Sequence, residues 1–92
     1  MKYESLMNKD ISLEFNGNIV NTYQIVEMTP TIKKIPGFEN RGNVYDCKVK
    51  WSKKIDGASE EQVMGFDEQT LNDLLNNKVA DCPGMPALKY KM

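Results

Sequence analysis

The sequence predicts an α+β fold, with a small antiparallel sheet of four or five strands and one short helix near residues 67–78. Two periodicities support this prediction. Apolar side chains recur at every second position in residues 11–15 and 44–51, as in half-buried strands. After Phe66 they recur at every third or fourth position, as along one face of a helix. Such a sheet can curl toward a small barrel, with the helix packed over one face or plugging one end.

The first two strands are expected to form a hairpin around the Asn-Gly pair at residues 16–17, because this pair readily adopts the positive φ angles of a tight turn. Residues 19–28 should then return antiparallel. A shift of one residue exchanges the two faces of a strand, so two registers stay open. A two-residue loop places Val20, Thr22, Val26 and Met28 beside the apolar face of residues 11–15, and a three-residue loop places Ile19, Tyr23 and Ile25 there.

Residues 29–43 are expected to form a long irregular connection. They contain Pro30, Pro36, Gly37 and Gly42, which favour turns and disfavour a central strand. A connection of this length is unusual in a small domain and tends to be functional or mobile. It is therefore the first segment in which to look for a binding surface.

Residues 44–51 are the strongest predicted strand. One face carries Tyr45, Cys47, Val49 and Trp51, and the other carries Asp46, Lys48 and Lys50. The first face should lie in the core and the second in water. Residues 53–59, which include an Asp-Gly pair, predict a turn into a fourth strand around residues 62–66.

The helix is expected to begin at Asp67, whose carboxylate can accept hydrogen bonds from the free amides of the first turn. Glu68 suits the positive end of the helix dipole. An apolar stripe follows at helical spacing, formed by Leu71, Leu74, Leu75 and, at its end, Val79. The prolines at positions 83 and 86 prevent any continuation, and residues 87–92 are expected to form a short last edge strand or a frayed tail.

The composition is that of a small globular protein. The 92 residues allow one modest core, so we expect a single domain spanning residues 1–92. The apolar runs are far shorter than the ~20 residues of a membrane-spanning helix, and the N-terminal residues do not resemble a signal peptide. No membrane partner is therefore expected, and the expected location is cytoplasmic. Two cysteines are too few for a disulfide scaffold, which agrees with a reducing compartment.

The sequence predicts no enzyme, no catalytic residue, no cofactor and no metal site. It contains no histidine, which removes the commonest general base and the commonest zinc ligand. The acidic residues show no spacing typical of an acid/base pair. Cys47 is expected to be a small buried side chain and Cys82 to be more exposed. A Cys47–Cys82 disulfide and a zinc site shared with a second copy are the minor alternatives.

Charge is distributed unevenly along the chain. Residues 33–54 hold seven basic and two acidic residues, a local charge of +5, and residues 55–82 hold one basic and seven acidic residues, a local charge of −6. A basic strand face could follow a phosphate backbone, but a solvated or protein-facing surface is commoner.

We therefore expect a small non-enzymatic binding module that recognises a macromolecular partner, in the first place a protein. Compact accessory proteins of phages and mobile elements, including inhibitors of host defence, have this combination of small size and missing chemistry. The alternatives are a small nucleic-acid-binding protein that uses the basic strand face, and a structural homo-oligomer such as a homodimer. The expected partner-binding residues are Lys33, Lys34, Phe38, Arg41, Lys48, Lys50, Lys53 and Lys54.

Overall fold

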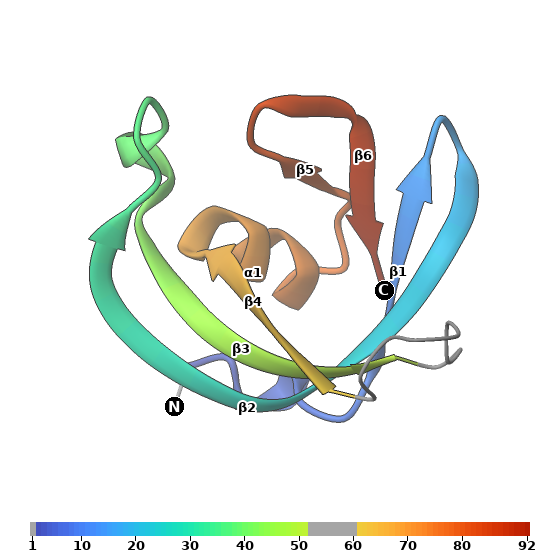
Figure 1. The fold of residues 1–92 in the computed structure, drawn as a ribbon, viewed down its shortest axis with the longest axis horizontal. Helices are drawn as coiled ribbons and strands as arrows, with labels where there is room; N and C mark the ends of the chain where they lie inside the picture. Colours follow the sequence, from blue (N-terminus) through green and yellow to red (C-terminus); the bar gives the residue numbers. More distant parts are fainter. Residues whose placement is uncertain (1, 52–60) are drawn as a thin grey trace.

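A curved antiparallel sheet wraps around one helix (Figure 1). The computed structural model describes residues 2–51 and 61–92. The strands are β1 (Asp10–Phe15), β2 (Asn18–Lys34), β3 (Asn43–Trp51), β4 (Glu61–Asp67), β5 (Ala80–Cys82) and β6 (Met85–Lys91), and the helix is α1 (Glu68–Leu75). Two short 3-10 turns complete the fold, η1 (Glu4–Leu6) and η2 (Glu39–Arg41).

The predicted α+β class is confirmed, but the predicted number of strands is wrong. The sheet has six strands in the order β4-β3-β2-β1-β6-β5, and it is not closed into a barrel. The difference arises in residues 80–91, where the sequence predicts only an edge strand or a frayed tail over residues 87–92. They form a hairpin instead, whose turn uses Gly84 at φ 76°. The longer strand of this hairpin, β6, lies between β1 and β5 and is not an edge.

The β1–β2 hairpin resolves the open register by means of a bulge. Its turn has two residues, 16 and 17, both with positive φ. The register then shifts between Leu13 and Glu14, which leaves Val20 as an extra residue on β2. An extra residue exchanges the faces of the strand that follows it. The odd-numbered residue Tyr23 is consequently buried, although the loop has the length that favoured the even-numbered set.

A second bulge in β2 changes the face again. The register with β3 shifts between Ile25 and Glu27, so Val26 is an extra residue. Ile25 is buried before the bulge and Met28 is buried after it. Neither of the two expected sets is therefore buried as a whole.

The expectation of an irregular connection over residues 29–43 is wrong for residues 29–34, because β2 continues to Lys34. Pro30 lies opposite Tyr45 of β3. The pairing of β2 with β1 extends only to Gln24, so this part of β2 has no β1 neighbour and Pro30 lies on an edge, where a missing amide is tolerated. The irregular segment is reduced to the residues between β2 and β3.

Both ends of the helix α1 are capped by hydrogen bonds. The Asp67 carboxylate accepts a hydrogen bond from the backbone amide of Thr70 at 2.7 Å, as expected. At the other end Asn77 adopts φ 58°, and its amide and that of Lys78 donate to carbonyls of the last turn. The helix therefore ends before residue 78, and Val79 is exposed instead of extending the apolar stripe.

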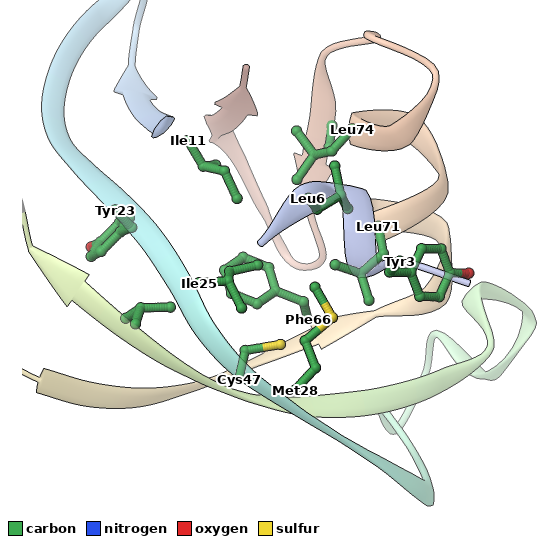
Figure 2. Close-up of a cluster of buried hydrophobic side chains, with 12 residues drawn as sticks. Tyr3, Leu6, Ile11, Tyr23, Ile25, Met28, Cys47, Phe66, Leu71 and Leu74 are labelled. Atoms are coloured by element: carbon green, nitrogen blue, oxygen red, sulfur yellow. The ribbon is translucent and has the colours of Figure 1, made fainter. Parts of the chain in front are cut away.

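The core lies between the concave face of the sheet and α1 (Figure 2). The expected inward face of β3 is confirmed, with Cys47 and Val49 fully buried and Tyr45 and Trp51 packed against the core. The N-terminal residues contribute side chains that the sequence did not predict to be buried. Tyr3, which precedes η1, and Leu6, the last residue of η1, are almost completely buried.

Candidate functional site

The end of β2 and the segment that joins it to β3 project from one corner of the molecule (Figure 1). We call residues 31–42, which include the last four residues of β2, the β2–β3 arm. Its first residues are irregular, since the β2–β3 register shifts between Pro30 and Lys34. Thr31 stabilises this bulge by donating a hydrogen bond from its hydroxyl to the carbonyl of Val44 at 2.6 Å. Beside it the side chain of Ile32 is 92% exposed, the highest value among the exposed large apolar side chains of the described residues.

The base of the β2–β3 arm is fixed by Arg41. Its guanidinium donates to the Asp67 carboxylate at 3.0 Å, to the Thr70 hydroxyl at 3.1 Å and to the Asp81 carbonyl at 3.1 Å. Asp67 is 1% exposed, so this ion pair is largely shielded from water. Arg41 therefore joins the arm to the start of α1 and to β5.

Gly42 adds a steric constraint at the same place. Its φ of 89° favours glycine, and a Cβ atom there would lie 2.9 Å from Cβ of Glu68. The Glu68 carboxylate accepts a hydrogen bond from the Asn43 amide at 3.1 Å. The arm is thus held at its base by both polar and packing contacts, whereas its first residues are exposed.

A pocket of about 240 Å³ lies between the β2–β3 arm and the β5–β6 hairpin. Its apolar lining residues are Phe38, Pro83, Met85 and Pro86, and its polar ones are Arg41, Asp81 and Lys89. Phe38 and Met85 are both exposed. The Lys89 ammonium donates a hydrogen bond to the Asp81 carboxylate and thereby lowers the pKa of that carboxyl. The pocket lining therefore combines apolar side chains with the ion pair of Lys89 and Asp81.

The outer face of β3 is less basic than its sequence suggests. The Lys48 ammonium lies 3.6 Å from the Glu27 carboxylate and 3.9 Å from the Glu61 carboxylate. Lys50 lies opposite Glu61 in the β3–β4 register. Asp46 adds a further carboxylate to this face, so acidic side chains match the two lysines.

The described members of the expected partner-binding set lie on two parts of the fold. Lys33, Lys34 and Phe38 belong to the β2–β3 arm, whereas Arg41 is bonded at its base. Lys48 and Lys50 lie on the outer face of the sheet and not on the arm. Lys53 and Lys54 lie outside the described residues, as does the expected turn over residues 53–59.

Sequence reasoning did not single out Ile32. It did indicate Met85, together with Met92, as a side chain that could lie on an adaptable contact surface. Ile32 stands between polar residues in a segment without alternation. An apolar residue flanked by polar or charged residues, with no partner at strand or helix spacing, is a signal that could have identified it. The signal is weak, because single exposed apolar residues are common on protein surfaces.

The two cysteines are both free. Cys47 is fully buried, and burial, with a smaller contribution from Asp46, raises the pKa of its thiol to about 12. Burial also raises the pKa of the Cys82 thiol. Neither environment favours a reactive thiolate. Over residues 2–51 and 61–92 no group of three or more Cys, Asp and Glu side chains is placed to hold a metal ion.

The buried thiol predicts an alkaline destabilisation. Between its ordinary pKa of 9.0 and about 12, the unfolded chain releases the Cys47 proton while the folded chain retains it. The contribution of this group to the free energy of unfolding is thus complete below pH 9 and is lost as the pH rises toward 12. We expect the free energy of unfolding, measured with urea, to fall less between pH 9 and pH 12 for Cys47→Ala than for the unmodified chain. The difference between the two proteins at neutral pH gives the effect of the substitution itself. An equal fall with pH in the two proteins would contradict the burial of the thiol.

No helix within the described residues is long and apolar enough to span a membrane. Comparison with protein-family models, with curated proteins and with solved structures finds no match.

Proposed function

We propose that this chain is a non-enzymatic binding module that recognises a protein partner through the β2–β3 arm and the adjoining pocket. The observation that carries the proposal is the 92% exposure of Ile32 beside the irregular bulge of the arm. One exposed aliphatic side chain is ordinary. Here, however, the same arm supplies Phe38, which lines an apolar pocket together with the exposed Met85.

The composition of this surface fits a protein interface. Such interfaces combine a few apolar anchors with a polar rim. Ile32, Phe38 and Met85 are the candidate anchors, and Lys33 and Lys34 supply charge beside the first of them. The contacts of Arg41 and Gly42 fix the base of the arm before a partner arrives, which reduces the conformational entropy lost on binding.

The outer face of β3 argues against nucleic acid as the partner. A protein that binds a phosphate backbone without sequence preference needs unpaired cations and, for single strands, exposed aromatic rings. Lys48 is close to two carboxylates, and the Trp51 ring packs edge-on against Tyr23 with 5.5 Å between centroids. We therefore expect no salt-sensitive binding of nonspecific DNA or RNA in a fluorescence-anisotropy titration. Binding that weakens steeply with salt would favour the nucleic-acid alternative.

The proposal predicts that Ile32→Ser strongly reduces capture of the partner. Ile32→Ser and a matched control, Ile19→Ser, change the same residue type at opposite ends of β2, and Ile19 is 65% exposed. Immobilised unmodified chain and both variants are incubated with extract of the native host, and the bound proteins are compared quantitatively. We expect a protein retained by the unmodified chain and by Ile19→Ser, and reduced at least about tenfold by Ile32→Ser, which corresponds to about 1.4 kcal/mol.

Two results would contradict the proposal. The first is equal retention by Ile32→Ser, and the second is a loss confined to Ile19→Ser. Because both side chains are largely in water, neither substitution should change the unfolding midpoint. If the retained protein is an enzyme or a host-defence factor, its activity in the presence of the chain tests the expected inhibitor role.

A further inference from the structure

The methionines within the described residues differ in their access to water. Met28 is buried, and Met7, Met64 and Met92 are half-buried and packed against the core. Met85 is the exception, because it is 56% exposed and lies outside the core cluster. A dissolved oxidant therefore reaches the thioether of Met85 more readily than that of any other described methionine.

The β5–β6 turn holds Met85 in this exposed position. The turn itself consists of Pro83 and Gly84, and Gly84 adopts φ 76°. Met85 follows as the first residue of β6 and lies opposite Cys82. Pro86 comes next, and a proline ring fixes its own φ, so the turn has few conformations available. The backbone that presents the thioether is therefore constrained.

Met85 also belongs to the candidate binding surface. It lines the pocket together with Phe38 of the β2–β3 arm. The ring of Phe38 lies close to the β5–β6 turn, since a Cβ atom at Gly84 would be 4.0 Å from its Cε2 atom. A chemical change at the thioether of Met85 would consequently alter the apolar lining that the proposed function assigns to the partner.

We propose that Met85 is a modification site, at which hydrogen peroxide converts the thioether to the sulfoxide and thereby weakens binding of the partner at this pocket. In this step an S–O bond forms and the O–O bond of the peroxide breaks. Sulfur loses two electrons, and the second peroxide oxygen leaves as water. The effect on binding rests on the proposed function, whereas the selectivity of the oxidation does not.

The change in polarity explains why the sulfoxide weakens binding. Oxidation replaces a flexible apolar side chain with a polar, chiral one. A partner that covers the apolar thioether has no reason to present a hydrogen-bond donor there, so the sulfoxide oxygen loses its contacts with water on binding. Burial of a polar group without a hydrogen bond is unfavourable.

The first experiment measures the oxidation of each methionine. The unmodified chain is treated with a graded series of hydrogen peroxide concentrations at neutral pH, and the sulfoxide fractions are measured by peptide mass spectrometry. We expect Met85 in the folded chain to be oxidised at least about fivefold faster than Met28 and Met64, and all three at similar rates in urea. Equal rates in the folded chain would overturn the proposal.

The second experiment measures capture of the partner. Immobilised chain is oxidised until Met85 alone is modified, and it is then incubated with extract of the native host. We expect retention of the protein that Ile32→Ser loses to fall at least about fivefold. Retention should return after treatment with methionine sulfoxide reductases for both epimers and dithiothreitol, which together remove the added oxygen as water.

Two variants separate Met85 from other oxidised groups. Met85→Leu keeps an apolar side chain without a thioether, so it should retain the protein before and after peroxide. Met64→Leu is the matched control and should respond to peroxide as the unmodified chain does. Because Cys82 lines the same pocket, Met85→Leu also controls for oxidation of that thiol.

Two results of the capture experiment would overturn the proposal. One is undiminished capture by chain whose Met85 is fully oxidised, and the other is an equal loss of capture by peroxide-treated Met85→Leu. The proposed function fails by a different result, equal retention by Ile32→Ser without any oxidant. The two failures are therefore distinguishable.

Discussion

Replacing Asp67 with alanine is expected to reduce the free energy of unfolding by about 3–5 kcal/mol, the usual cost of leaving one member of a buried ion pair without its partner. The substitution leaves the Arg41 guanidinium, which is 17% exposed, without its carboxylate. It also removes the cap of α1, because the Thr70 amide loses its acceptor. A domain of this size has a total stability of roughly 5–10 kcal/mol, so the variant should be close to unfolding.

Urea unfolding followed by circular dichroism measures this effect. Asp67→Asn retains an oxygen for the Thr70 amide and removes only the charge, so its loss should be intermediate. Asp73→Ala is a matched control on the same helix, since the contact of Asp73 with Gln69 is exposed. We expect that control to cost less than about 0.5 kcal/mol. A loss of the same small size for Asp67→Ala would contradict the structural role of the ion pair.

Leu71→Ala is expected to reduce the free energy of unfolding by about 2–4 kcal/mol. Leu71 is completely buried among the side chains that α1 presents to the concave face of the sheet. The substitution removes apolar surface from the core and leaves a cavity that a well-packed interior fills only in part. Leu75→Ala is the matched control, because Leu75 lies one turn later and is only half-buried.

The two leucine variants should therefore differ clearly in their urea midpoints. We expect Leu75→Ala to lose less than half as much as Leu71→Ala, in proportion to the smaller area it takes from the core. A loss below about 0.5 kcal/mol for Leu71→Ala would mean that the helix does not cover the sheet as described.

The inward face of β3 and the start of α1 could be predicted from the sequence because both depend on local rules. Alternation of apolar residues fixes which face of β3 is buried, and a capping aspartate marks where a helix begins. The side chains of β2 could not be assigned to the buried or the exposed face in this way. Each of the extra residues Val20 and Val26 reverses the alternation, and neither bulge has a sequence signal of its own.

The remaining differences have a tertiary cause. Pro30 is compatible with a strand only because the pairing of β1 with β2 does not extend beyond Gln24, so no β1 residue lies beside Pro30. This depends on the arrangement of the sheet. Tyr3 is buried because its hydroxyl donates to Asn72 of α1 at 2.9 Å and its ring packs edge-on against Tyr45. These partners are 69 and 42 positions away along the chain, so no local pattern could identify them.

The candidate site was predicted only in part for the same reason. The sequence indicated that the region after residue 29 is the most probable surface for binding and that it contains Lys33, Lys34 and Phe38. It could not indicate that Arg41 would be bonded to a buried carboxylate or that carboxylates of neighbouring strands would lie beside Lys48. Those facts depend on which strands become neighbours.

Hydrogen exchange of the chain with and without its captured partner tests the binding surface most directly. If the β2–β3 arm contacts the partner, amides of residues 31–42 and of the β5–β6 turn should exchange more slowly in the complex, and those of the β1–β2 turn should be unchanged. Slower exchange confined to the β1–β2 turn or to the outer face of β3, with the arm unchanged, would contradict the proposal.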